Sequence, residues 1–318
     1  MITANLVKIF LALTLCLASA KGFAENCKPS KWGADDEIGS ANYVSPEQVL
    51  AAVKLVKQGQ SHPLGIVIDQ NTPAFPPRYL RLQVVQPGQH SHGPYELPFG
   101  WDAVYTDDLA QLWLGIGSQL DGLGHMGEAG YYYNCNRGAD FIDVSGLKKL
   151  GTHQVPPMIG RGVLLDMTRH FSMPMLPAGK GISAEDLKQA AIAQDVEIKQ
   201  GDVVLIHTGW TDGMLKSDPA AWGSGEPGLT NDAARHLASL NPMAVGADTW
   251  GIEAIPAIEG DKTFYGHVIF LKENGIYLLE TMDTGRLAQE GVKEFLFVLG
   301  QARIRGTVQM VINPVAMW

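Results

Sequence analysis

Short apolar segments with strand character outnumber helical runs in this chain, and this imbalance most constrains its fold. Nine such segments occur, at residues 64–68, 80–85, 112–120, 162–166, 203–207, 243–246, 276–279, 295–299 and 307–312. Three helical runs, each behind a Ser or Thr cap, are expected over 46–56, 184–193 and 231–240. Because strands and helices do not alternate strictly, the pattern favours an α/β fold of mixed sheets over a doubly wound parallel sheet.

The glycine and proline content and the net charge indicate further which kind of protein this is. The 318 residues include 36 Gly and 18 Pro, which indicates many tight turns. Acidic residues outnumber basic ones by 33 to 24, giving a formal charge of −9. Since no run of Lys or Arg occurs, we expect neither a nucleic-acid partner nor an anionic membrane surface.

The first 24 residues have the pattern of an export signal. Lys8 precedes an apolar run over residues 9–18, which is too short to span a bilayer, and small residues follow at 18–20 and 22–24. We therefore expect residues 1–24 to be a signal peptide and 25–318 the folded domain, with no membrane association once the signal is removed. The expected location is periplasmic or secreted.

Removal of that signal would leave two cysteines, Cys27 and Cys135. An even count in an oxidising compartment permits one disulfide between them. Two unrelated thiols are the alternative, because two residues give no spacing pattern.

Several common catalytic motifs are missing from the sequence. It has no Gly-x-Ser-x-Gly turn, phosphate-binding Gly-Lys-Ser/Thr loop or Cys-x-x-Cys pair. A dinucleotide fingerprint that begins at Gly115 fails because Leu120 occupies its third glycine position.

The segment 115–125 instead gathers polar residues at a glycine-rich strand end. Extended geometry places Gln119 and Asp121 on one face and Leu120 on the other, and the following glycines allow His125 to turn back. A carboxylate, an amide oxygen and an imidazole there would suit a divalent metal ion. Hydrogen-bonded turn residues are the alternative interpretation.

A second segment, 267–280, strengthens the metal interpretation. His267 opens a helical turn, Asn274 and Gly275 interrupt it, and Glu280 ends a short apolar strand. A glutamate after such a strand should be paired, exposed or bound to a metal.

Together the two segments resemble the cyclase-like metal-dependent hydrolases, a superfamily that includes bacterial kynurenine formamidase and isatin hydrolase. That family carries His-x-Gly-Thr-His-x-Asp-x-x-x-His, then a distal His and Glu around a Gly-Ile turn. Further ordered blocks of the resemblance lie at 32–42, 160–166, 201–210, 227–230 and 246–250. The resemblance implies a single domain with a β/β/α arrangement.

The resemblance also implies a ligand set, with two departures. Asp121, His125, His267 and Glu280 match the ligand types of the family, whereas Gly115 and Gln119 stand where it has histidines. Loss of two imidazoles favours one metal ion over two, with Gln119 close enough to ligate or to hold a water. An oxygen-rich set shifts the expected cofactor from Zn²⁺ toward Mn²⁺.

Several aromatic residues and the remaining histidines are additional candidates for the site. Trp250 and Tyr133, which flank the motif blocks, are expected to bind substrate, and the other candidates are Trp101, Tyr131 and Tyr132. His90 and His92 are interpreted as solvated loop residues, and His207 as a hydrogen-bonded core residue.

The expected activity is metal-dependent hydrolysis of an amide, formamide, lactam or lactone in a small molecule, arylformamidase-like by resemblance. His125 or Glu280 would transfer the proton of the attacking water. A homo-oligomer is expected. Two alternatives stay open: a family member that binds metal without catalysis, and a periplasmic binding protein for small molecules.

Overall fold

Four strands with almost continuous apolar sequence form the centre of the fold. They are β7 (Met158–Asp166), β9 (Val203–His207), β11 (Ala244–Ala247) and β12 (Tyr277–Glu280), and they run parallel in that order. Most of their residues are buried, as expected for parallel strands that are covered on both faces. The computed structural model describes residues 27, 29–85 and 106–318.

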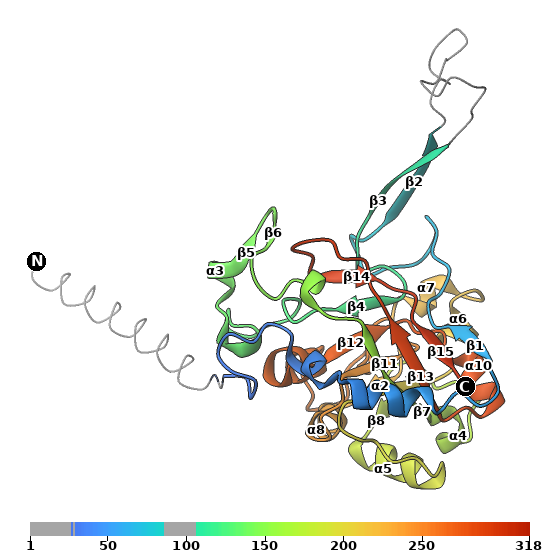
Figure 1. Cartoon of the computed structure of the whole chain (residues 1–318). Helices are drawn as coiled ribbons and strands as arrows, with labels where there is room; N and C mark the ends of the chain where they lie inside the picture. The colour runs from blue at the N-terminus through green and yellow to red at the C-terminus, as the bar shows by residue number, and fades with distance from the viewer. Residues whose placement is uncertain (1–26, 28, 86–105) are drawn as a thin grey trace, which may run out of the picture.

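Antiparallel strands extend this centre on both sides into a nine-stranded mixed sheet, so the expected mixed α/β single domain is confirmed (Figure 1). The sheet order is β1-β15-β13-β7-β9-β11-β12-β4-β14. The added strands are β1 (Ser61–Pro63), β4 (Gln119–Asp121), β13 (Glu294–Leu299), β14 (Gln309–Val311) and β15 (Val315–Met317).

Each of the three longer helices begins at a side-chain cap. Ser45, Ser183 and Thr230 cap α2 (Pro46–Val53), α5 (Ala184–Ala193) and α8 (Asn231–Ser239). Helix α2 packs against β7 and β13, while α5 contacts both α8 and β7. These caps were readable in the sequence, and α2 and α8 end earlier than expected.

Short helices and small sheets complete the described chain. The helical turns are η1 (Gly39–Tyr43), η2 (Tyr133–Cys135), α3 (Gly138–Phe141), η3 (Thr152–Gln154), α4 (Met167–Phe171), α6 (Trp210–Met214), α7 (Pro219–Trp222), α9 (Tyr265–His267), η4 (Val268–Glu273) and α10 (Gly285–Glu290). The two-stranded sheets pair β2 (Leu80–Val85) with β3 (Asp107–Leu112), β5 (Ile142–Asp143) with β6 (Gly146–Leu147), and β8 (Gly181–Ile182) with β10 (Gly228–Leu229).

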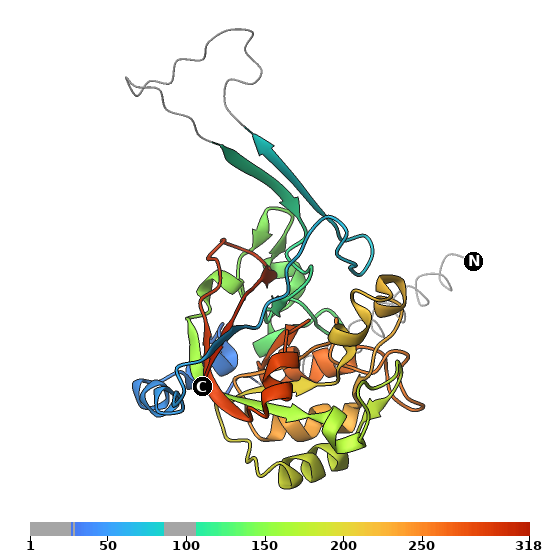
Figure 2. The ribbon, with the colours of Figure 1, turned by 90° about the vertical axis from the view of Figure 1, so that its right-hand side faces the viewer.

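The β2–β3 ribbon projects from the body of the molecule in both views (Figures 1 and 2). Among the described residues, no helix is long and apolar enough to cross a membrane. The expected signal peptide (1–24), Trp101, His90 and His92 lie outside the described residues.

Two expected strands are corrected by the structure. The segment 112–120 is not one strand: β3 ends at Leu112 and β4 begins at Gln119. Gly117, with φ of +62°, turns the chain between them in a conformation that glycine adopts easily. The segment 64–68 follows strand β1 instead of forming a strand of its own.

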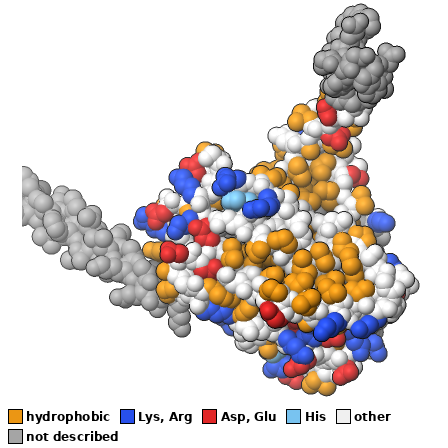
Figure 3. Space-filling model, in the orientation of Figure 1, with side chains coloured by type: hydrophobic (Ala, Val, Ile, Leu, Met, Phe, Trp, Pro, Cys, Tyr) orange, Lys and Arg blue, Asp and Glu red, His pale blue; other side chains and the backbone are white. Residues whose placement is uncertain are grey.

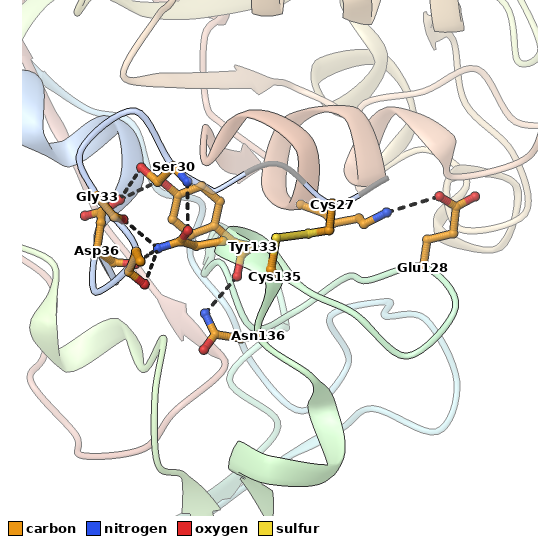
Figure 4. Close-up of a disulfide and its surroundings, with 11 residues drawn as sticks. Cys27, Ser30, Gly33, Asp36, Glu128, Tyr133, Cys135 and Asn136 are labelled. Carbon is orange, nitrogen blue, oxygen red and sulfur yellow. Dashed lines mark hydrogen bonds and ion pairs between the residues drawn. A yellow bond between two sulfur atoms is a disulfide. The ribbon is translucent and has the colours of Figure 1, made fainter. Parts of the chain in front are cut away.

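A disulfide joins Cys27 to Cys135, as expected, with Cα atoms 5.6 Å apart (Figure 4). It fixes the start of the described chain to η2 across a sequence separation of 108 residues.

Candidate metal centre

Strand register places the polar residues of the site on one face of the sheet. Gln119 on β4 lies directly opposite Glu280 on β12, and Asp121 lies opposite Gln309 on β14. Because alternate residues of a strand share a face, Gln119 and Asp121 point the same way, as the sequence predicted.

Two imidazoles converge on Asp121. A turn in which the His125 amide donates to the Gly122 carbonyl (2.9 Å) brings the His125 Nε2 to 3.7 Å from Asp121 Oδ2. His267 at the end of α9 brings its Nε2 to 3.6 Å from the same oxygen. Ligand atoms of these three residues all lie within 4.8 Å of one another.

Glu253 fixes the orientation of His267. The Glu253 Oε1 accepts hydrogen bonds from the backbone N–H of His267 and from its Nδ1, each at 2.8 Å. Since Nδ1 is used in this way, Nε2 faces Asp121 and Glu280. A carboxylate behind a histidine is a common support for a metal ligand.

Glu280 lies beside this group and has its own partners. Its Oε1 is 3.1 Å from His267 Nε2, and its Oε2 accepts a hydrogen bond from the Gln119 amide. The Gln119 nitrogen also lies 3.4 Å from Asp121 Oδ1. In this arrangement Gln119 presents its amide nitrogen, and not its oxygen, to the two carboxylates.

Burial and charge shift the pKa values of these groups. Burial, together with the charge of Asp121, raises the pKa of Glu280 to about 7. Burial opposes ionisation of Asp121, but His125 and His267 outweigh it and hold its pKa at about 2. Burial would lower the pKa of His267, yet Glu253, Asp121 and Glu280 together raise it well above its usual value. Burial is also the main reason that the pKa of His125 is lowered.

A divalent ion fits this group. Asp121 Oδ2 is fully buried and has no hydrogen-bond partner among the described residues. Ligands about 2.0–2.2 Å from a tetrahedral ion lie roughly 3.3–3.6 Å apart, close to the two His–Asp separations. The region also holds four buried carboxyl groups, on Asp121, Glu226, Glu253 and Glu280, and a cation would offset the charge of those that are ionised.

Aromatic rings flank the site next to His267. The Phe264 ring centroid lies 5.8 Å from that of His267 and 6.1 Å from that of Trp250. Phe75, which is 52% exposed, lies 6.1 Å from Trp250. Buried Glu226 accepts hydrogen bonds from the Trp250 and Gly251 amides and so fixes this turn.

Tyr133 does not belong to this aromatic group, which corrects its expected substrate-binding role. It is 3% exposed, its hydroxyl bonds to Ser30 Oγ (2.7 Å) and Asp36 Oδ2 (2.5 Å), and its ring packs on Gly275. Figure 4 shows it beside the disulfide, pointing toward Ser30 and Asp36. Its partners give it a packing role.

Four residues around the site were not predicted from the sequence. They are Glu226, Glu253, Gln309, whose amide nitrogen donates to Asp121 Oδ1, and Arg78, which donates to the Gly115 carbonyl. Glu253 lies between Ile252 and Ala254, so the argument that a carboxylate in an apolar stretch needs a partner applied to it as it did to Glu280. Gln309 is a single amide in an apolar strand. No pattern in the sequence around Arg78 indicated that it lies near the site.

Comparison with known proteins places this chain in a family. The family model for Cyclase, described as "Putative cyclase", matches residues 61–254, more than half of the chain. The chain belongs to the cyclase family. The matched range includes Gln119, Asp121, His125 and Glu253. A search of curated proteins finds no match.

Solved structures share the cyclase fold. A crystal structure of a novel cyclase is 29% identical, with a TM-score of 0.80, and the match covers 91% of this chain and 98% of that one. Isatin hydrolase A from Labrenzia aggregata, bound to benzyl benzoate, is 17% identical with a TM-score of 0.58 (86% and 98% covered). A predicted metal-dependent hydrolase from Bacillus stearothermophilus is also 17% identical, with a TM-score of 0.53 (82% and 98% covered). The similarity to the last two structures shows a shared fold and nothing more.

Proposed function

We propose that this cyclase-family protein is a metal-dependent hydrolase of a small molecule with an amide, formamide, lactam or lactone bond. The observation that carries the proposal is the unpartnered Asp121 Oδ2, buried 3.6–3.7 Å from two imidazole nitrogens. An oxygen without a partner in such a place is costly unless a cation binds it. Asp121, His125 and His267 would hold the ion, either Mn²⁺ or Zn²⁺.

When bound, a divalent ion would supply a Lewis acid for the scissile carbonyl and lower the pKa of the attacking water. Glu280 would accept the proton of that water. Its position beside the three-residue group and the hydrogen bond from Gln119 to one of its oxygens support this role. Trp250, with Phe264, would line the substrate side.

The test compares Asp121→Asn with Asp143→Asn, an exposed aspartate in β5, by elemental analysis and by rates on formanilides, lactams and lactones. We expect Asp121→Asn to lose both bound metal and activity, while Asp143→Asn keeps both. Full hydrolysis by metal-free Asp121→Asn would overturn the proposal. Wild type that binds metal but hydrolyses nothing would be a non-catalytic family member, and wild type without metal would favour a solute-binding protein.

A second comparison separates ligand from proton acceptor. Glu280→Gln should keep its metal while the rate falls by about 10²- to 10⁴-fold, whereas His125→Ala should lose metal and rate together. Loss of metal from Glu280→Gln would instead make Glu280 a ligand.

We also propose an exported protein. The Cys27–Cys135 disulfide supports an oxidising compartment such as the periplasm or the exterior. Cell fractionation with thiol labelling of the native protein tests this: free thiols on a cytoplasmic protein would contradict it.

A further inference from the structure

Gly115, which stands where the family carries a histidine, is packed against two side chains from other parts of the chain. A Cβ atom added to Gly115 would lie 2.5 Å from Gln309 Oε1 and 2.8 Å from Arg78 Nη1. Both distances are shorter than real contacts allow, so the space beside Gly115 is already filled. The ends of an amide and a guanidinium side chain therefore occupy the position that a side chain at residue 115 would take.

These two side chains are fixed in different ways. The Gln309 amide nitrogen donates to Asp121 Oδ1 at 2.7 Å, which connects this position directly to the metal centre. The Arg78 Nη1 donates to the Gly115 carbonyl at 2.6 Å, at the base of the ribbon that begins with β2. Arg78 is thus positioned at the border of the site by a neutral partner.

The charge of Arg78 has no carboxylate partner among the described residues, although four buried carboxyl groups lie in this region. A guanidinium has five N–H donors, and the Gly115 carbonyl accepts from one of its nitrogens. A positive charge at this border would oppose binding of a metal ion, so metal binding does not explain it. A positive charge there would favour a substrate that carries its own negative charge.

From this arrangement we infer that Arg78 recognises a carboxylate on the substrate, beside the bond that is hydrolysed. The inference rests on the proposed hydrolase function and narrows its substrate class to anionic amides or lactones. Guanidinium and carboxylate form paired, charge-assisted hydrogen bonds, which lysine or an amide cannot reproduce. Phe75, three residues before Arg78, lies 6.1 Å from the Trp250 ring, so the same segment also contributes to the aromatic group beside His267.

The experiment uses two formamides that differ by one group, N-formylanthranilate and formanilide. We expect wild type to favour the carboxylate compound in kcat/KM by roughly 10- to 100-fold, the range for hydrogen bonds to a charged group. Arg78→Met should abolish this preference and Arg78→Lys should restore part of it. The control Arg81→Met removes an exposed arginine that stacks on Tyr79 and should keep the preference.

A binding measurement makes the result independent of turnover. Calorimetry with metal-free protein should show tighter binding of N-formylanthranilate than of formanilide in wild type and in Arg81→Met, and equal binding in Arg78→Met. Two outcomes would overturn the role of Arg78 without contradicting the hydrolase function. One is equal kcat/KM and equal affinity for the two compounds in wild type. The other is an equal loss of activity and affinity toward both compounds in Arg78→Met. Absence of hydrolysis would count against the proposed function, and the binding data would still decide the inference.

Discussion

At the scale of single residues, the carboxylate of Glu253 decides which nitrogen of His267 is available. It holds both the backbone N–H and Nδ1 of His267, so Nε2 is directed at Asp121. A neutral amide at position 253 would keep the shape but remove the charge that strengthens the histidine as a ligand.

We therefore predict that Glu253→Gln lowers metal affinity by about 10- to 100-fold without unfolding the protein. Metal titration monitored by elemental analysis or a competing chelator measures the change, and circular dichroism verifies the fold. Glu259→Gln, an exposed glutamate on the same segment, is the matched control. Unchanged affinity in Glu253→Gln would mean that His267 needs no support.

His207 is a buried hydrogen-bonded histidine, as the sequence indicated, and its charge is linked to stability. Its Nδ1 lies 2.8 Å from Thr284 Oγ1 and 3.4 Å from Asp248 Oδ2. Burial lowers its pKa, but Asp248, with smaller contributions from Asp166 and Asp212, raises the pKa above 6.5 overall. A group with a raised folded-state pKa stabilises the fold below its unfolded pKa, and this contribution is lost as the pH rises through the folded value.

We predict that the difference in unfolding free energy between wild type and His207→Gln is largest at pH 6 and below, and decreases as the pH rises above about 6.5. Urea unfolding at several pH values measures it. A difference that stays constant with pH would show that folding leaves the pKa of His207 unchanged.

At the scale of elements, β4 is a three-residue strand that serves two purposes. Gln119 and Asp121 face the site, while Leu120 between them is fully buried on the opposite face. Pairing with β12 on one side and β14 on the other fixes its register, and a slip by one residue would exchange the two faces.

Leu120→Ala is expected to destabilise the protein by about 2–5 kcal/mol through the cavity it leaves. Metal affinity of the folded variant should stay near that of wild type, because the side chain points away from the site. Chemical denaturation and metal titration test the two parts. Loss of metal affinity in protein that is still folded would mean that strand position, and not only stability, depends on this leucine.

At the scale of the whole molecule, the disulfide closes a loop that spans 108 residues of sequence. By chain-entropy arguments, a bridge over such a loop contributes about 4–5 kcal/mol. We predict that the double variant Cys27→Ser/Cys135→Ser unfolds at a markedly lower urea concentration than wild type, while the metal content of the folded protein is unchanged. Equal midpoints would mean that this bridge adds nothing to stability.

The projecting β2–β3 ribbon is the basis for proposing a homo-oligomer. Leu82 and Val84 on it are 58% and 66% exposed, and Figure 3 shows hydrophobic side chains along it. Since a lone two-stranded ribbon is marginally stable in water, we expect a second copy of the chain to cover it. Sedimentation should show a dimer or larger species that Leu82→Ser/Val84→Ser dissociates and Leu50→Ser, on α2, does not. A monomeric wild type would contradict this.

Local patterns in the sequence determined much of what this protein is. The strands at 80–85 and 203–207, the three helix caps, the common face of Gln119 and Asp121, and the turn that returns His125 all follow from spacing over a few residues. Such features depend on backbone periodicity and turn chemistry, which neighbouring residues carry.

Only the tertiary structure decided which distant residues complete the site. Gln309 reaches Asp121 because β14 pairs with β4 across 188 residues, and Glu253 reaches His267 because of the fold around α9. Tyr133 is close in sequence to His125, but its hydroxyl hydrogen-bonds to Asp36 instead of facing the site. Strand pairing and packing are non-local, since their free energy depends on contacts that no single segment contains. The filling of the space beside Gly115 by Arg78 and Gln309 is therefore a property of the folded chain alone.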